Sequence, residues 1–320
     1  MKSPLLSLPG AVPAEGPDEG VAAHYGDIFR EQRNLARGTG FVDLSHRGVV
    51  TVTGADRLSW LHLLLTQHVS ELAPQHATEA LVLSPNGHVE HALYLVDDGT
   101  TTWAHVEPGT QGALVAYLES MKFFYRVEAA DATADYAVVH LPAGSTVPVE
   151  GAAAVRELPY GRDLFLPRAE LAELTAGYGP AAGVWAYEAL RIEGHRPRLG
   201  FETDHRTIPH EVDWLRTAVH LQKGCYRGQE TVARVHNLGR PPRRLVFLHL
   251  DGTEETLPPH GTEVRSAADP EGRAVGFVTS SARHHELGPI ALAIVKRNVP
   301  VDAVLLAGTV PGTQDVIVPQ

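Results

Sequence analysis

The chain has 320 residues, more than one hydrophobic core usually serves, so two or three domains are expected. Hydrophobic residues make up 43% of it and charged residues 20%, which excludes collagen-like and disordered proteins. The formal net charge of −11 repels phosphate backbones, so nucleic acid is not an expected partner.

Cysteine content and hydropathy indicate the compartment. One cysteine cannot form an intramolecular disulfide, and no run of about 18 apolar residues is present to span a membrane. The opening segment MKSPLLSLPGAVPAEG lacks the apolar stretch of a secretory signal. We therefore expect a cytoplasmic protein with no membrane partner.

The first part of the chain predicts an arm followed by an α+β domain over 24–140. Residues 1–23 are rich in Pro, Gly and Ala without periodicity, which predicts a flexible arm. Leucines at three- and four-residue spacing predict a helix over 55–69, with Asp56 as its N-cap. Asn86-Gly87 is a strong hairpin signal. The other expected elements are helices at 26–37 and 112–124 and strands at 49–52, 80–84, 88–96 and 101–106.

Two further domains are expected. The middle one, over 141–242, opens with a linker-like stretch and is predicted to be α+β, with a strand at 163–166 and helices at 168–176 and 181–193. The last, over 243–320, has short apolar runs separated by Gly, Pro and Asp, which predict a small β-barrel or sandwich. The runs are 245–250, 263–266, 274–280, 290–295, 303–306 and 316–318.

The motif KGCYRGQE holds the only cysteine. Its residues are Lys223, Gly224, Cys225, Tyr226, Arg227, Gly228, Gln229 and Glu230. The two glycines allow tight turning, so an ordered loop is expected to present Cys225 and Tyr226. Lys223 and Arg227 are expected to lower the pKa of the thiol by favouring its thiolate. The alternative is that Cys225 is a small buried hydrophobe.

Cations are concentrated around this motif. Between residues 216 and 244 the only acid is Glu230, which gives a local balance of +6. Such an island would attract a carboxylate- or phosphate-bearing ligand, unless its charges pair with acids from elsewhere. The cations are Arg216, Lys223, Arg227, Arg234, Arg240, Arg243 and Arg244.

Two glutamates before the motif are candidate ligand-binding groups. Glu193 ends a predicted helix in which Tyr187 is expected to be partly buried, and Gly194 supplies the stop. A carboxylate at a cavity mouth can accept two parallel hydrogen bonds from the ring N–H and amino group of a pterin or guanine. The alternative for Glu193 is an exposed helix-end residue. For Glu211, after Pro209, it is an ordinary capping or surface acid.

No metal site is expected. On the hairpin, strand alternation puts His88 and Glu90 on one face and His91 on the other, so the three do not converge on one ion. His284 and His285 form a second candidate. Phosphate-binding loops, dinucleotide fingerprints and nucleophile elbows are absent from the sequence, which argues against phosphoryl and hydride transfer.

KGCYRGQE, taken with the preceding YEALRIEGHRPRLGFETDHRTIPHE, resembles the YgfZ family of folate-binding proteins, relatives of the glycine-cleavage T protein. The resemblance implies an α+β fold, a T-protein-like ring of two α+β domains and a C-terminal β-barrel around a central folate pocket. It implies tetrahydrofolate or a reduced one-carbon folate as cofactor. The cofactor-binding residues are then Glu193, Tyr187, Lys223 and Arg234, and the segment with Thr207, Pro209 and Glu211 matches a T-protein signature.

One departure from the T proteins bears on activity. Where they carry adjacent aspartates after the hairpin turn, this chain has Glu90 and His91, which would not hold the same geometry. The leading hypothesis is a tetrahydrofolate-binding accessory protein for iron–sulfur cluster assembly or repair. Cys225 is then the functional thiol, and assembly or client proteins are the partners. The rival is a folate-dependent one-carbon transferase or demethylase that uses Glu90 or His91. A third, weaker hypothesis is a binding module for another heterocyclic anion.

Overall fold

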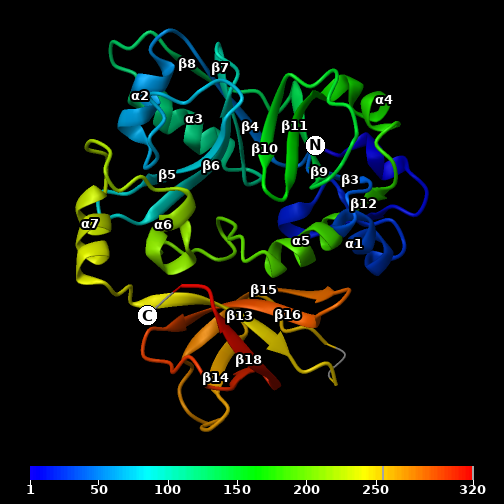
Figure 1. Ribbon diagram of the computed structural model, residues 1–320, viewed down its shortest axis with the longest axis vertical. Coiled ribbons are helices and arrows are strands. Elements are labelled where there is room, and N and C mark those ends of the chain that lie inside the picture. Colours follow the sequence, from blue (N-terminus) through cyan, green and yellow to red (C-terminus); the bar gives the residue numbers. More distant parts are fainter. Residues whose placement is uncertain (254–255, 319–320) are drawn as a thin grey trace. The chain divides into compact units, whose positions relative to one another are not determined.

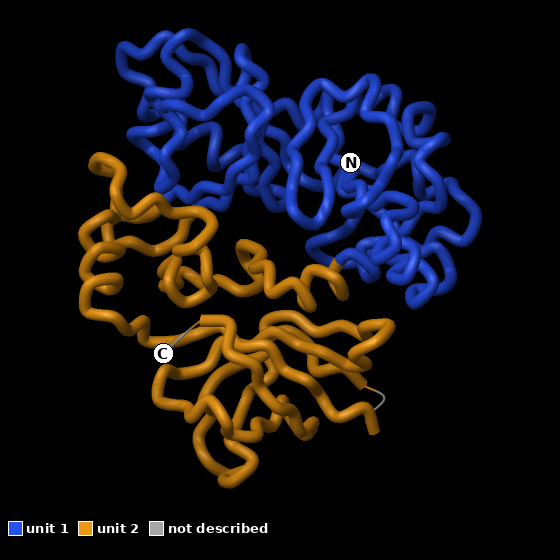
Figure 2. Tube along the Cα trace, in the orientation of Figure 1, with its two compact units in different colours: residues 1–82, 91–187 blue, residues 83–90, 188–320 orange. Residues whose placement is uncertain are grey.

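A computed structural model describes residues 1–253 and 256–318 (Figure 1). The chain divides into two compact units, drawn in blue and orange in Figure 2. The first unit comprises residues 1–82 and 91–187, and the second comprises residues 83–90 and 188–320. The turn of the predicted hairpin therefore belongs to the second unit.

Besides the 3-10 helices Pro4–Ser7, Gly16–Asp18 and Arg168–Glu170, the elements lying wholly or mainly in the first unit are four α-helices and twelve strands in the described part of the chain. They are β1 (Val12–Pro13), β2 (Ala22–His24), α1 (Ile28–Ala36), β3 (Phe41–Asp43), β4 (Gly48–Thr53), α2 (Arg57–Leu64), β5 (Ala77–Leu83), β6 (Val89–Asp97), β7 (Thr101–Val106), α3 (Gln111–Ser120), β8 (Glu128–Asp131), β9 (Tyr136–Pro142), β10 (Ala154–Leu158), β11 (Gly161–Pro167), α4 (Leu171–Thr175) and β12 (Ala181–Ala182).

The remaining elements lie mainly in the second unit. They are α5 (Val184–Glu193), the 3-10 helix η4 (Pro209–Val212), α6 (Trp214–Thr217), α7 (Gln229–Leu238), β13 (Arg243–Leu250), β14 (Glu263–Ser266), β15 (Gly276–His284), β16 (Gly288–Lys296), β17 (Leu305–Ala307) and β18 (Val310–Val316). None of the helices in residues 1–253 and 256–318 is long and apolar enough to cross a bilayer.

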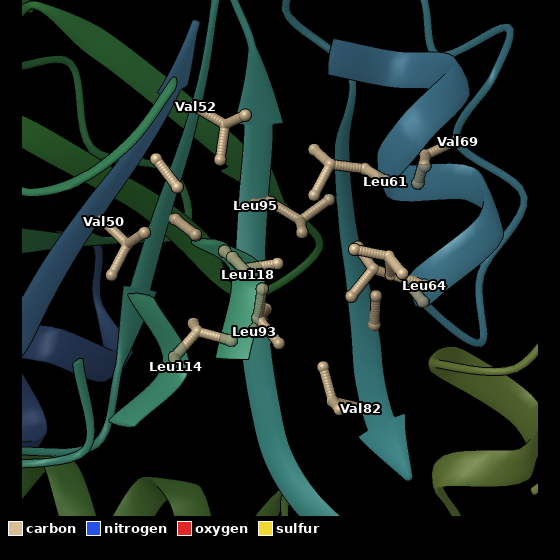
Figure 3. Close-up of a cluster of buried hydrophobic side chains, with 14 of the residues drawn as sticks. Val50, Val52, Leu61, Leu64, Val69, Val82, Leu93, Leu95, Leu114 and Leu118 are labelled. Atoms are coloured by element: carbon tan, nitrogen blue, oxygen red, sulfur yellow. The ribbon is translucent and has the colours of Figure 1, made fainter. Parts of the chain in front are cut away.

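The first sheet has the strand order β5-β6-β7-β4-β8, and its apolar face is covered by helices. The strands expected at 49–52, 80–84, 88–96 and 101–106 thus lie in one sheet, with the helices expected at 55–69 and 112–124 on its apolar face. Apolar side chains that alternate along the strands meet the apolar faces of α2 and α3, and this burial stabilises the domain. Figure 3 shows the cluster, which includes Val50, Val52, Leu61, Leu64, Leu93, Leu95, Leu114 and Leu118.

The second sheet has the order β10-β11-β9-β3-β12, so it combines strands from distant parts of the chain. Strand β9 hydrogen-bonds to β11 on one side and to β3 on the other. The division expected between residues 140 and 141 falls inside β9. This expected boundary therefore does not separate two sheets, because residues on both sides of it belong to one strand that pairs with β11.

The amino-terminal segment differs from the arm expected over 1–23. Leu5 is 3% exposed and packs in the core of the second sheet, where Phe41 also lies. The Ser3 hydroxyl donates to the Asp43 carboxylate. The segment has no apolar periodicity, so no sequence pattern indicated that it packs. Its few apolar residues are nevertheless enough to pack it against the sheet.

The carboxy-terminal domain is a closed barrel with the order β13-β16-β15-β14-β17-β18. It begins at Arg243, and β13 closes it by pairing with both β16 and β18. Closure pairs the edge strands of the sheet, and alternate residues point inward to form the core. The inward residues include Val246, Leu248, Val264, Val278, Ala293 and Leu305.

Asp56 does not cap α2, contrary to expectation. It makes no capping hydrogen bond and accepts instead from Arg126, whose Nη2 lies 2.8 Å from Oδ1. These hydrogen bonds lower the pKa of Asp56 to about 2. The Asp56 carboxylate therefore accepts hydrogen bonds from a guanidinium 70 residues away in sequence instead of from the first backbone N–H groups of its own helix.

Candidate functional site

The motif KGCYRGQE forms a loop that leads directly into α7. Gly228 precedes the helix with a φ of +82°, a left-handed conformation that favours glycine. Cys225 is exposed, as expected of a presented thiol, and the buried-hydrophobe alternative is wrong. Tyr226, expected to be presented beside it, is only 8% exposed. The loop therefore offers the thiol alone and uses the aromatic ring for packing.

Two glycines let this loop pack against the hairpin turn. A Cβ added to Gly87 would lie 2.7 Å from the Cβ of Thr231. One added to Gly228 would lie 2.6 Å from the backbone oxygen of Ser84. Real Cβ atoms do not approach so closely, so both positions require glycine for contact as well as for turning.

An ion pair joins the same two segments. Arg227 Nη2 lies 3.2 Å from Glu90 Oε1, with each side chain about one-third exposed. A backbone hydrogen bond of 2.9 Å from the Val89 N–H to the Thr207 oxygen also ties the hairpin to the segment before the motif. The structure thus brings Glu90, a possible catalytic residue, to the cysteine loop.

The two cations expected to act on the thiol are engaged elsewhere. Lys223 is 6% exposed, and its Nζ lies 5.2 Å from the centre of the Tyr226 ring. Burial lowers the pKa of Lys223 to about 8, because a desolvated ammonium is disfavoured. Arg227 pairs with Glu90, as described above. Each of the two cations therefore has a partner other than the thiol.

Glu193 ends α5, as the glycine stop predicted, and its side chain is 46% exposed. One carboxylate oxygen lies 3.4 Å from Nε2 of His284, whose side chain is 1% exposed. Burial is the main cause that lowers the pKa of His284, which favours a neutral imidazole. The Glu193 carboxylate thus contacts His284 on one side. Its other side is exposed and can accept hydrogen bonds from a ligand.

The other expected cofactor-binding residues lie in different surroundings. Tyr187, in the first unit, is 8% exposed and meets His140 edge-on at 5.1 Å between ring centres. Arg234 lies on α7 in the second unit with an exposed side chain. Lys223 and Glu193 also belong to the second unit.

Much of the cationic island is neutralised by acids from outside it. Arg243 Nε donates to Glu211 Oε1 at 2.8 Å, and its Nη1 donates to Asp204 Oδ2 at 2.6 Å. Arg216 pairs with Asp213 at 2.7 Å. Pairing with acidic neighbours, the alternative to anion attraction, is therefore correct for these arginines.

Of the two roles that the alternative allowed for Glu211, capping or surface acid, the structure shows capping, and the residue is not at the surface. It is 1% exposed, and besides Arg243 it accepts from the Ile208 N–H at 3.2 Å. It thus caps η4 and also fixes Arg243 at the start of the barrel.

A buried network that the sequence did not reveal anchors the end of α5. The guanidinium of Arg191 lies 3.1 Å from Glu202 Oε2 and donates to Ser280 Oγ at 2.7 Å. Glu202 is 1% exposed and also accepts from Thr279 Oγ1 at 2.9 Å. These bonds join the helix that carries Glu193 to β15. No local pattern marks the link from Glu202 to β15, because the hydroxyl donors to this carboxylate, Thr279 and Ser280, lie 77 and 78 residues away.

A second buried network, in the first unit, centres on Asp163. This carboxylate accepts from His140 Nδ1 at 2.8 Å and Arg156 Nη1 at 3.0 Å, and lies 3.1 Å from His105 Nε2. The His partners help to hold the pKa of Asp163 well below its usual range, against the opposing effect of burial. Burial lowers the pKa of His105 to about 4.

The residues that the structure describes contain no group of three or more His, Cys, Asp or Glu side chains that could hold a metal ion. Cys225 could supply one ligand at most to a cluster, since an iron–sulfur cluster normally takes four.

Comparison with known proteins assigns the barrel. Residues 243–311 match the model of the glycine cleavage T-protein C-terminal barrel domain. The whole chain has the fold of the glycine cleavage system aminomethyltransferase T from Bartonella henselae. The TM-score is 0.81 at 18% sequence identity, and the match covers 98% of this chain and 94% of that one. The expected T-protein-like α+β fold with a terminal barrel is thereby confirmed.

Curated relatives of this T-protein-like chain include proteins of two kinds. It is 27% identical over 298 residues to a mitochondrial iron-sulfur cluster assembly factor IBA57 homolog of Mycosarcoma maydis, covering 79% of this chain and 73% of that protein. It is 27% identical over 331 residues to an aminomethyltransferase of Nostoc sp., covering 86% of this chain and 81% of that protein.

Proposed function

We propose that this chain is a tetrahydrofolate-binding accessory protein that supports iron–sulfur cluster assembly or repair. The observation that carries the proposal is the exposed Cys225 on a loop clamped to the hairpin by the Glu90–Arg227 pair. An exposed thiol on an ordered loop is accessible to a partner protein or a cluster intermediate. Similarity to the IBA57 homolog supports the same role.

The hairpin argues against aminomethyl transfer as the main activity. By resemblance, Glu90 stands where T proteins use an aspartate on the reacting part of the folate. Here its carboxylate is paired with Arg227, whose guanidinium holds it toward the motif loop. A general base needs to reach the proton that it abstracts, so this pairing favours a positioning role for Glu90.

The residues around Glu193 fit a folate. A pterin offers a ring N–H and an amino group side by side, and a half-exposed carboxylate can accept both. The buried His284 contacts one side of the carboxylate, so the exposed side is the one that a ligand would meet. Lys223 and Arg234 are the proposed partners of the glutamyl tail. Bound folate would supply a one-carbon carrier, while the chain itself orients the ring.

Similarity to aminomethyltransferases keeps a folate-dependent one-carbon transferase as the second candidate. The two candidates differ in what they require. The transferase needs Glu90 or His91 for its chemistry and has no use for a thiol at Cys225. The accessory protein needs Cys225 and tolerates loss of the Glu90 charge.

Calorimetric titration with tetrahydrofolate, 5-formyltetrahydrofolate and 5,10-methylenetetrahydrofolate tests the folate site. Glu193→Gln is expected to raise the Kd about five- to thirtyfold, the effect of about 1–2 kcal/mol for a half-exposed charge-assisted hydrogen bond. Glu271→Gln removes an exposed barrel carboxylate and is the matched control. Equal folate affinity in Glu193→Gln and the wild type would remove Glu193 from the site.

A second assay separates the two candidates. Supplied with an aminomethylated lipoyl carrier and tetrahydrofolate, the protein is expected to release no ammonia above background. Turnover at about 1 s⁻¹ or faster would favour the transferase.

A further inference from the structure

A separate pocket of about 330 Å³ opens beside η4, α6 and α7 in the second unit. Its walls are mainly apolar, and two imidazoles reach it. The volume lies within the range of pockets that bind small molecules, about 300–1,000 Å³. The residues used below are His210, His236, Leu215, Leu221, Val235 and Pro241.

His210 is the buried polar group of this pocket. It is 6% exposed, and neither ring nitrogen makes a hydrogen bond of normal geometry within the described chain. Burial, with the nearby His236, lowers the pKa of His210 to about 4, so the ring is neutral at pH 7. The backbone oxygen of Val232 lies close enough to favour a ring N–H toward it. The other nitrogen is then a buried acceptor without a donor.

The fold holds His210 firmly in this position. The next residue, Glu211, is fixed by Arg243 and by the Ile208 N–H, so η4 cannot easily turn. A buried polar group left without a hydrogen-bond partner is destabilising, because it raises the free energy of the folded state. A ligand that supplies a donor to His210 would recover part of this free energy on binding.

The two charged side chains that line the pocket do not favour a charged ligand. Asp213 and Arg216 both line the pocket, and they pair with each other at 2.7 Å. Their charges therefore largely cancel. The apolar walls favour a ligand with an apolar body, and the neutral imidazole favours a single donor on it.

We propose that this pocket binds a small, uncharged, mainly apolar molecule that carries one O–H or N–H donor, which hydrogen-bonds to His210. This site is distinct from the folate site proposed at Glu193, and nothing in the proposed function requires it.

Phenol and toluene test the proposal, because they differ mainly in the donor. Titration of the full-length protein followed by NMR gives both Kd values. In the wild type, phenol is expected to bind saturably and to shift the His210 ring signals. His210→Leu removes the acceptor, so the preference for phenol over toluene should fall about tenfold. His210→Gln retains an acceptor and should recover part of that preference, while His249→Leu, on the barrel surface, should leave it unchanged.

Three results would overturn the proposal. One is no saturable binding of either probe, which would mean that the pocket holds only water. Another is a phenol preference that is the same in His210→Leu and the wild type. The last is displacement of phenol by tetrahydrofolate, which would make this pocket part of the folate site. Loss of folate binding in Glu193→Gln with phenol binding intact would separate the two sites.

Discussion

Arg227 Nη2 lies 3.2 Å from Glu90 Oε1, so the cysteine loop and the hairpin turn are joined by a charge pair. Gly87 and Gly228 allow the backbones of the same two segments to touch. Together these contacts make the hairpin and the loop one structural feature. The thiol therefore lies on a loop that is held by contacts with the hairpin.

Glu90→Gln tests the role of this pair. An exposed ion pair contributes about 0–1 kcal/mol, so the free energy of unfolding should change by less than about 1 kcal/mol. Function in a strain that lacks its own homologue should be retained. Chemical denaturation and growth of the complemented strain measure the two effects. A stable Glu90→Gln protein that fails to complement would support a catalytic Glu90 and the one-carbon transferase.

Gly228→Ala and Gly224→Ala form a matched pair within the motif. Gly228 has a φ of +82° and no room for a Cβ, whereas no atom lies within 4 Å of a Cβ added to Gly224. Gly228→Ala should lower the free energy of unfolding by about 1–3 kcal/mol. Gly224→Ala should change it by less than about 1 kcal/mol. Urea denaturation of both variants is the measurement, and equal effects would contradict the packing described here.

Arg243→Ala should be strongly destabilising. It leaves Glu211, at 1% exposure, as a buried carboxylate without its cation, which costs about 3–5 kcal/mol. Arg240→Ala, at an exposed position three residues earlier, should stay within about 0.5 kcal/mol. The midpoint of urea denaturation reports both. A mild effect of Arg243→Ala would show that water or another cation reaches Glu211.

Stability should fall as the pH drops from 6.5 toward 4. Burial lowers the pKa of His105 from 6.5 to about 4, so in this window the unfolded imidazole binds a proton that the folded one does not. The contribution is complete above pH 6.5 and is lost as the pH approaches 4, by up to about 3 kcal/mol.

The variant that checks this assignment is His105→Gln, which keeps a donor for Asp163. Its free energy of unfolding should depend less steeply on pH than that of the wild type. His249→Gln, at a half-exposed barrel position, should keep the wild-type slope. A wild-type stability that does not change between pH 6.5 and 4 would contradict the buried, neutral His105.

Local sequence signals predicted most of the elements. The Asn86-Gly87 pair predicted the β5–β6 turn, where Gly87 has a φ of +80°. Gly194 correctly marked the end of α5, although the residue with a left-handed φ there is His195. Short apolar runs separated by Gly, Pro and Asp predicted five of the six barrel strands, whereas the run expected at 316–318 meets β18 only at the last residue of that strand. The packing of the amino-terminal segment was not predictable, since it depends on a few apolar contacts with a distant sheet.

The site was predictable where it depended on neighbours in sequence. Flanking glycines predicted the exposure of Cys225, but the partner of Arg227 is 137 residues away and no local pattern identifies it. The same holds for Asp56, which paired with Arg126 rather than capping its helix. Charged side chains choose partners through the tertiary fold, so their roles require the structure.

Cys225→Ser gives the most direct test of the accessory role. The variant and the wild type are expressed in a strain that lacks its own homologue, and the activity of an iron–sulfur enzyme is measured together with the amount of folded protein. Because Cys225 is exposed, the substitution should change the free energy of unfolding by no more than about 0.5 kcal/mol. The account predicts normal accumulation of the variant with loss of the enzyme activity that the wild type restores. Full restoration of that activity by Cys225→Ser would contradict it.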